Sequence, residues 1–380
     1  MSLHSGNLAT QTLFAELTQR ALDAEFDELY DERGMFTRKR IKTRAYWYYR
    51  RGEGGKKNYT YVGPVGDKEV NDRVKKFDAI KSNYRQRREM VRALLATGLH
   101  RPDPVAAEII EALSRAGFFR LRGVLIGTLA FQCYGGILGT RISGTILQTS
   151  DADLAQFYDV SHLIGDSIPP ILDVLRKVNP TFTPIPNVFY PNRATRFGTD
   201  TGYLVEFLTP NRGSDDNQGK PAEMPALGGA SALPLRYLDF LIRDPIRSVV
   251  LYKGGVPVSI PSPERYAIHK LIVAVRRTQE PAKSPKDIAQ AEQLIRACLF
   301  QRSFALFEVW EEACGRGPSW RDLLRRGRAM LSADVRDAFI LSLESHGWSE
   351  RRLAARQRTK RPATETTKRS RRRLGTGAKR

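Results

Sequence analysis

Cysteine is scarce in this chain of 380 residues, where only Cys133, Cys298 and Cys314 occur. Three widely spaced thiols exclude a disulfide framework and a thiolate zinc site. Long hydrophobic runs are missing too, since no stretch approaches the roughly 18 apolar residues of a transmembrane helix. The first 30 residues read as an acidic helix, without the basic and then apolar segments of a signal peptide. We therefore expect a cytoplasmic protein with reduced thiols and no membrane segment.

Acidic residues are outnumbered, with 62 Lys and Arg against 41 Asp and Glu and a net charge of +21. About half of the excess lies in residues 350–380, which hold 13 Lys and Arg but only 2 Asp and Glu. Such a segment buries too little apolar surface to offset its chain entropy, so residues 349–380 are predicted to be a disordered basic tail. The tail either contacts nucleic acid or acts as a solubilising terminus.

The length predicts two or three domains, and the mixture of helical and strand patterns predicts an α+β fold. We place N-terminal helices with a β-hairpin at 1–117, a mixed-sheet core with flanking helices at 118–260, and a helical domain at 261–348. Within these units the patterns predict helices over 11–32, 67–97, 103–116, 129–136, 167–178 and 238–242, strands over 118–126, 249–252 and 256–260, a hairpin over 196–208 and a long loop over 211–232.

The predicted N-terminal hairpin, residues 34–64, has an unusual composition. Two β-rich runs flank a glycine-bearing loop at 52–55, and together they carry nine Lys and Arg and six Tyr and Trp. Basic residues beside aromatic rings suit nucleic acid, because phosphates attract the charges and bases stack on the rings. The other interpretation, which we favour for the rings, is that they pack on a neighbouring helix while the charges face solvent.

A glycine turn follows the predicted strand at 118–126. Gly127 and Thr128 stand between this strand and the helix predicted at 129–136. A strand, a tight turn and a helix N-terminus aim backbone N–H groups at one point, which favours phosphate. Glycine turns open many helices, so the turn gains meaning only from the residues around it.

Two aspartates one residue apart, Asp151 and Asp153, lie in a partly apolar strand-like segment. Residues i and i+2 of a strand project from the same face, so both carboxylates point to one place. Glu206 stands in another strand-like run. Three converging oxygen ligands suit Mg²⁺, whereas a salt bridge with a nearby arginine such as Arg141 is the structural alternative for the aspartate pair.

These motifs together resemble the nucleotidyltransferase superfamily typified by DNA polymerase β, and more narrowly a group of bacterial nucleotidyltransferase-fold proteins. The resemblance covers roughly residues 34–300. Its most specific parts are the aspartate pair and the two later runs His269–Leu271 and Lys286–Ala291. The matching segments are Tyr61–Pro64, Ile126–Gly139, Thr149–Leu154, Val205–Pro210, Pro261–Leu271 and Lys286–Ala291.

The resemblance implies two Mg²⁺ (or Mn²⁺) ions that bridge a nucleoside triphosphate. Asp151 and Asp153 would hold the ion on the phosphates, and Glu206 would join them at the second ion and favour deprotonation of the acceptor hydroxyl. Two departures stand out, because the third acid is Glu rather than the commoner Asp and the turn reads Gly-Thr rather than Gly-Ser or Gly-Gly.

Cations and the glycine turn complete the expected substrate site. Gly127 and Thr128 would contact phosphate, and Lys270 and Lys286 would neutralise the leaving pyrophosphate. Arg276, Arg277 and His269 are interpreted as surface or packing residues. Asp287 is expected to pair locally or to cap a helix.

The predicted function is Mg²⁺-dependent transfer of a nucleotidyl group from an NTP to a hydroxyl of RNA, protein or a small molecule. RNA is weakly favoured because of the basic hairpin and tail. A toxin-like role, with a protein acceptor or an antitoxin as partner, is compatible with the same resemblance. The alternative is an inactive nucleotidyltransferase fold that binds nucleic acid and has no use for three converging acids.

Overall fold

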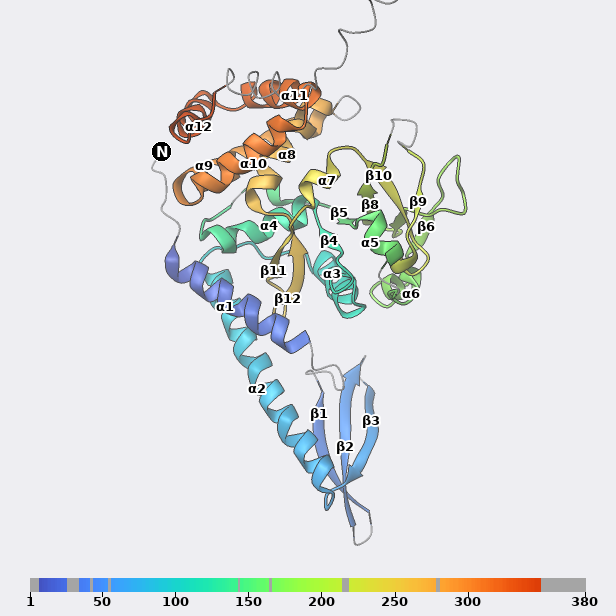
Figure 1. Cartoon of the computed structure of the whole chain (residues 1–380). Coiled ribbons are helices and arrows are strands. Elements are labelled where there is room, and N and C mark those ends of the chain that lie inside the picture. Colours follow the sequence, from blue (N-terminus) through green and yellow to red (C-terminus); the bar gives the residue numbers. More distant parts are fainter. Residues whose placement is uncertain are drawn as a thin grey trace, which may run out of the picture.

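Helices flank a mixed β-sheet in the middle of the chain, and a second, smaller sheet lies apart from it (Figure 1). The computed structural model describes residues 7–25, 34–41, 44–53, 56–142, 144–163, 166–213, 219–277 and 281–349. The predicted tail from residue 350 onward and the hairpin tip at 54–55 lie outside these described residues. Among the described residues, no helix has both the length and the apolar character needed to cross a bilayer. The mixed α+β fold that the sequence predicts is confirmed.

The central sheet runs in the order β4-β5-β8-β10-β9, with β7 pairing on β8 and β6 on β7. β5 and β10 are parallel to β8, whereas β4 is antiparallel to β5, so the sheet is mixed. Its strands are β4 (Val124–Leu125), β5 (Asp151–Ala155), β6 (Thr183–Ile185), β7 (Arg196–Gly198), β8 (Leu204–Pro210), β9 (Ala222–Glu223) and β10 (Ser231–Leu235).

Short helices surround this sheet. Helix α3 begins where Asp103 accepts hydrogen bonds from the backbone N–H groups of Val105 and Ala106, with a proline at the first helical position. Helix α4 ends at Gly139, whose φ of 60° is the left-handed conformation that often closes a helix. The helices are α3 (Pro104–Arg115), α4 (Gly127–Leu138), α5 (Tyr158–Leu163), α6 (Ile171–Arg176) and α7 (Leu238–Leu241), with short 3-10 turns at Thr145–Leu147 and Pro225–Leu227.

The N-terminal part forms an arm (Figure 1). Helix α1 (Leu8–Glu25) and the C-terminal half of helix α2 (Lys68–Ala96) pack together and against β11, and they bury Phe14, Leu17 and Leu94. The other end of α2 supports the antiparallel sheet of β1 (Met35–Ile41), β2 (Arg44–Glu53) and β3 (Lys56–Pro64). A 29-residue helix spans about 43 Å, so this small sheet lies well away from the central one.

C-terminal helices cover the side of the central sheet opposite the arm (Figure 1). A two-stranded hairpin, β11 with β12, leads into them. Buried residues from 106 to 343 form one continuous hydrophobic cluster. The core therefore continues across the domain boundary expected near Pro261. The elements are β11 (Ile246–Val250), β12 (Val256–Ile260), α8 (Pro263–Arg276), the 3-10 turn Pro281–Lys283, α9 (Ser284–Gln301), α10 (Ser303–Gly315), α11 (Pro318–Ala329) and α12 (Ala333–Ser345).

The strand predicted over 118–126 is wrong for most of its length. Residues 118–122 form turns, and only Val124 and Leu125 belong to a strand. Phe118 and Phe119 are fully buried, and Arg122 adopts a φ of 62°. The apolar run therefore reflects side chains that enter the core from a tight turn, which a strand-like composition cannot distinguish from a buried strand.

Two further expectations change in detail. The β-rich run that starts at Phe36 consists of two strands, since β1 ends at Ile41 and β2 begins at Arg44, so the hairpin is a three-stranded sheet. The segment 211–232, expected to be a loop, contains β9 and the start of β10. The expected hairpin around residue 200 is confirmed, because β7 pairs antiparallel to β8.

Candidate active site

The three carboxylates predicted from the sequence lie on one face of the central sheet. Strands β5 and β8 run parallel in a register that places Asp153 opposite Glu206 and Asp151 opposite Leu204. Ala152 and Val205 alternate with the acids and are fully buried on the other face. Asp151, Asp153 and Glu206 are themselves only half-buried. The register thus brings together acids that are more than 50 residues apart in the chain.

The Gly127 turn lies directly against Asp153. β4 pairs with β5, and the backbone N–H of Ile126 donates to the Asp153 carbonyl at 2.9 Å. Gly127 has a φ of +64°, and a Cβ added there would lie 2.1 Å from Asp153 Oδ2. Glycine is required twice at this position, for the backbone conformation and for the space that the carboxylate fills. Thr128 follows in the first turn of α4 and is largely buried.

Charge crowding changes the chemistry of Asp153. Burial raises the pKa of this carboxyl from its ordinary 3.8 to about 7, and the negative charges of Asp151 and Glu206 add to the rise, while Lys270 and Lys283 oppose it. Like charges that share a site disfavour each other's ionisation. The same surroundings that penalise a third negative charge favour a cation placed among the three acids.

This pKa predicts a stability effect in metal-free protein. The folded-state pKa of Asp153 lies above the unfolded one, so its contribution is fully present below about pH 4 and is lost as pH rises through 7. Asp153→Asn removes the penalty. In EDTA we therefore expect the variant's free energy of unfolding to exceed that of the wild type by a margin that grows from pH 5 to pH 8. One pKa unit corresponds to about 1.4 kcal/mol, so the margin reaches a few kcal/mol.

Urea unfolding at several pH values measures this margin. Asp173→Asn is the matched control, because Asp173 is an exposed carboxyl on α6. A margin for Asp153→Asn that stays constant with pH would show that Asp153 ionises without penalty.

The side chains at the site can be compared with what a metal ion requires. Within the part of the chain that the structure describes, no three or more His, Cys, Asp or Glu side chains stand in an arrangement that could already hold a metal ion. The hydroxyl of Thr149 donates to Asp151, and Glu206 lies 4.0 Å from the Arg196 guanidinium. The donor set suits a hard cation such as Mg²⁺, and its crowded negative charge would be relieved by one.

Arg141 does not supply the salt bridge weighed as the alternative for the aspartate pair. Its guanidinium donates to the backbone carbonyl of Thr97 at 2.7 Å. The positive charges that act on Asp153 come instead from the helical part of the chain, where Lys270 and Lys283 lie.

Helices α8 and α9 hold the predicted cations in place. Lys270 Nζ donates to Asp287 Oδ1 at 2.6 Å, and Arg277 Nε donates to Asp287 Oδ2 at 2.9 Å. Asp287 is almost fully buried, and the ammonium and guanidinium groups hold its pKa below the usual range against the opposing effect of burial. Lys286 donates to the Gln148 carbonyl at 2.6 Å. Asp287 therefore pairs across the two helices, with Lys270 and Arg277, and not locally with the adjacent Lys286, which donates to Gln148. The charge of Lys270 also acts on Asp153.

A tyrosine and a glutamine connect the same two helices to the site, and the sequence interpretation assigned them no role. The Tyr266 hydroxyl lies 3.0 Å from the Gly127 carbonyl and 3.0 Å from Gln290 Oε1. Gln290 Nε2 donates to the Ile146 carbonyl at 2.8 Å. Both residues are fully buried. The turn at Gly127 and the segment leading to Asp151 are therefore both tethered to helices α8 and α9. In the sequence, the matching segments 261–271 and 286–291, which contain Tyr266 and Gln290, were the signal that could have indicated this role.

His269 stands next to Lys270 on α8. Burial and the adjacent Lys270 charge lower the pKa of His269 to about 3, so its ring is neutral, in keeping with its interpretation as a packing residue.

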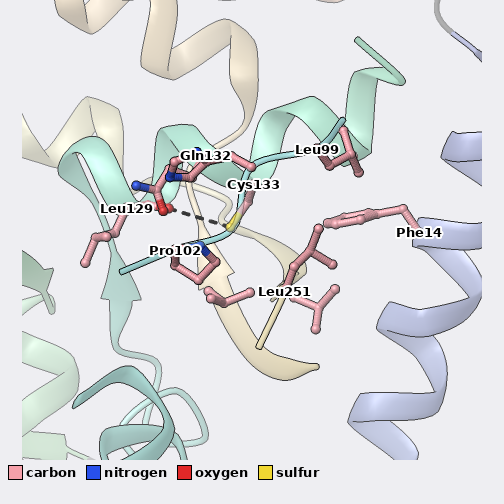
Figure 2. Close-up of a pocket in the computed structure, with 11 residues that line it drawn as sticks. Phe14, Leu99, Pro102, Leu129, Gln132, Cys133 and Leu251 are labelled. Atoms are coloured by element: carbon pink, nitrogen blue, oxygen red, sulfur yellow. Dashed lines mark hydrogen bonds between the residues drawn. The ribbon is translucent and has the colours of Figure 1, made fainter. Parts of the chain in front are cut away.

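Figure 2 shows a small, mostly apolar pocket beside α4, lined among others by Phe14, Leu99 and Cys133. Burial raises the pKa of the Cys133 thiol to about 12. None of the three carboxylates lines this pocket, so it is separate from the candidate site.

A mixed sheet with acids on two adjacent parallel strands and a glycine turn beside them defines a nucleotidyltransferase-like site. Residues 105–315 match the family model described as Nucleotidyltransferase. The match covers more than half of the chain, so the chain belongs to the nucleotidyltransferase family.

Similarity to individual proteins is weaker. A solved structure, described as an antigenic nucleotidyltransferase-like protein from Paracoccidioides brasiliensis, is similar over 58% of this chain and 93% of that chain, with 15% identity and a TM-score of 0.29. Comparison with curated proteins gives no match.

Proposed function

We propose that the protein is a Mg²⁺-dependent enzyme that transfers a nucleotidyl group from a nucleoside triphosphate to a hydroxyl acceptor. Membership of the nucleotidyltransferase family supports the class of reaction. The observation that carries the proposal is the register of β5 and β8, which sets Glu206 beside Asp153. Asp151 lies two residues away on the same face, and the Gly127 turn adjoins them.

Each carboxylate has a distinct task in this proposal. Asp151 and Asp153 would hold a cation that binds the triphosphate. Glu206 would share a second cation with them and accept the proton of the acceptor hydroxyl directly or through water. The bound cations would offset phosphate charge and lower the pKa of the acceptor hydroxyl. Because the pKa of Asp153 is raised to about 7 in metal-free protein, a cation bound there would displace a proton from this group near neutral pH.

The turn and the helical cations orient the triphosphate. Gly127 and Thr128 stand at the N-terminus of α4, where backbone N–H groups favour phosphate oxygens. Lys270, held by Asp287, and Lys286, held by the Gln148 carbonyl, stand on the side from which α8 and α9 cover the site. Positive charge placed there in advance stabilises the leaving pyrophosphate without reorganisation.

The acceptor is a hydroxyl of RNA, of a protein side chain or of a small molecule. A toxin-like role, with an antitoxin as partner, is compatible with an RNA or protein acceptor. The competing function is an inactive nucleotidyltransferase fold that binds nucleic acid.

Incorporation of label tests the proposed function. The purified protein is incubated with each α-³²P-labelled NTP, Mg²⁺ or Mn²⁺, and total RNA, a protein extract or a pool of small hydroxyl compounds. We expect label in one acceptor class with at least one NTP, and loss of that label in EDTA. Label that persists at full level in EDTA would contradict the role of the metal. Nucleic-acid binding with no turnover of any NTP would favour the inactive fold.

A further inference from the structure

The arm sheet has two different faces. On the inner face Phe36 and Tyr49 pack edge-on against Phe77 of α2, with ring centroids 4.9 and 5.9 Å from that of Phe77. Trp47 Nε1 donates to Asn71 Oδ1 of the same helix at 2.9 Å. These contacts confirm, for the inner rings, the interpretation that they pack on a neighbouring helix.

The opposite face carries a different set of side chains. Lys39 Nζ lies 5.0 Å from the ring centroid of Tyr48 and 3.4 Å from that of Tyr59, so β1, β2 and β3 all contribute to this face. The strand register pairs Lys39 with Tyr46, and Arg50 with Tyr59. We call Lys39, Tyr46, Tyr48, Arg50 and Tyr59 the outer face.

Positive charge dominates around the outer face. Lys39 and Arg50 are the basic residues of the outer face, and the exposed Arg38 and Arg40 project from the other face of β1, which contains no acidic residue. Among the residues that the structure describes, no acidic side chain forms an ion pair with Arg38, Lys39 or Arg40. Tyr59 is 42% exposed, a high fraction for a ring that lies under a lysine. Figure 1 shows this sheet at the end of α2, away from the central sheet and from its strands β5 and β8.

We propose that the outer face binds single-stranded RNA. Cations at this spacing meet backbone phosphates, and adjacent tyrosine rings offer stacking platforms for unpaired bases. The bases of a duplex are already stacked and cannot use these rings. RNA is favoured over DNA because the three rings end in hydroxyls, and the ribose 2′-OH is a hydrogen-bond partner that DNA lacks. The binding is a function additional to nucleotidyl transfer and does not depend on it.

The test measures fluorescence anisotropy of the full-length protein with a labelled, unstructured 12-nucleotide RNA, the matching DNA strand and the corresponding RNA duplex. Buffer with EDTA and without NTP prevents any transfer. We expect the RNA strand to bind tighter than the DNA strand, and both to bind tighter than the duplex. Asp153→Asn should bind RNA as the wild type does, which separates this inference from the proposed catalysis.

Variants of the outer face divide the contributions. Tyr48→Leu/Tyr59→Leu removes stacking and should weaken binding of the RNA strand about tenfold, which corresponds to about 1.4 kcal/mol. Tyr48→Phe/Tyr59→Phe keeps the rings and should lose only the preference for RNA over DNA. Lys39→Gln should lower the slope of log Kd against log salt by about one. Lys177→Gln removes one exposed charge at the C-terminal end of α6 and should change nothing beyond a small general loss of affinity.

The basic residues 350–380 are present in every variant, so their contribution cancels in these comparisons. Ultraviolet crosslinking followed by peptide mapping should place RNA on residues 35–64. Wild-type affinity in the folded double-leucine variant would overturn the proposal, as would a preference for the duplex, for DNA or for an acidic polypeptide such as polyglutamate. If circular dichroism shows the double-leucine variant to be unfolded, Tyr59→Leu alone carries the same comparison, because its ring is exposed.

Discussion

Replacement of Asp153 by Asn is expected to reduce nucleotidyl transfer by about a thousandfold or more while the fold stays intact. The Asp153 carboxylate lies opposite Glu206 in the strand register, on the same face as Asp151 and against the Gly127 turn. Loss of its charge removes a ligand shared by the proposed cations, and metal stabilisation of a phosphoryl transition state is worth several kcal/mol. Each 1.36 kcal/mol is roughly a tenfold change in rate. Label incorporation from α-³²P-NTP under single-turnover conditions measures the loss.

Mg²⁺ supplies a second readout that is independent of turnover. Millimolar Mg²⁺ should raise the melting temperature of the wild type and leave that of Asp153→Asn nearly unchanged, because a ligand stabilises only the state that binds it. Asp173→Asn, which alters an exposed carboxyl on α6, should show wild-type transfer and the wild-type response to Mg²⁺. Transfer by Asp153→Asn at the wild-type rate would refute the assignment of this residue.

The aspartate pair was predictable because it rests on a local rule. Side chains two apart on a strand share a face whatever the rest of the fold does, and the alternation of buried and half-buried residues in β5 follows this rule. The partnership with Glu206 was of another kind. It depends on which strand pairs with β5 and in which register, and a shift of one residue would have turned Glu206 to the buried face. The sequence offered Glu206 as a third acid in a strand-like run, and the resemblance to a family assigned it to the same site, but neither contained the strand order or the register.

Residues 118–126 show where composition misleads. Phe118, Phe119 and Leu121 are apolar and buried, as strand residues would be, yet their backbone forms turns. A short apolar run indicates that its side chains are buried. Whether the segment is a strand or a turn depends on its backbone hydrogen bonds, which the apolar run does not indicate. The two strand residues that remain, Val124 and Leu125, are those that hydrogen-bond with β5.

The sequence indicated which lysines the helices contribute to the site, but not which residues these lysines contact. Lys270 and Lys286 were predicted. Lys270 of α8 pairs with Asp287 of α9 and its charge acts on Asp153, and Lys286 of α9 donates to the Gln148 carbonyl ahead of β5. Their partners lie 17 and 138 residues away in the chain, so no local pattern contains them. The tether of Tyr266 and Gln290 was missed for the same reason. Its hydrogen bonds join two helices to the Gly127 turn through buried side chains, and a buried tyrosine reads from sequence as a core residue.

The two faces of the arm sheet follow from the alternation of side chains along its strands, which can be read from the sequence. Alternation along β1 and β2 separates Phe36, Tyr49 and Trp47, which face α2, from Lys39 and Tyr48, which face away. The two interpretations of the rings, packing and nucleic-acid contact, therefore apply to different faces of one sheet. Neither interpretation alone describes all the aromatic rings of the sheet.

Gly127→Ala is expected to reduce transfer by about a hundredfold or more and to destabilise the protein. A Cβ at this position would lie 2.1 Å from Asp153 Oδ2, far inside contact distance, and an alanine at a φ of +64° costs about 1–2 kcal/mol in backbone strain. The carboxylate must move away from the turn, or the turn must unwind and strain the hydrogen bond between the Gly127 carbonyl and Tyr266. Either change displaces a carboxylate or the phosphate-facing N-terminus of α4, and a misplacement of about 1 Å costs on the order of a hundredfold in rate.

Gly315→Ala separates this effect from the general consequence of adding a methyl group. Gly315 ends α10, needs no positive φ, and leaves open space where a Cβ would lie, with no neighbouring atom within 4 Å. Alanine there should keep full transfer and leave the free energy of unfolding equal or slightly higher, since alanine favours a helix over glycine by up to about 1 kcal/mol. Gly127→Ala should instead lower the free energy of unfolding by about 1–3 kcal/mol in urea titrations. An active, undiminished Gly127→Ala enzyme would mean that neither the close approach of Asp153 nor the left-handed turn matters for the reaction, and the site would have to be sought elsewhere on the fold.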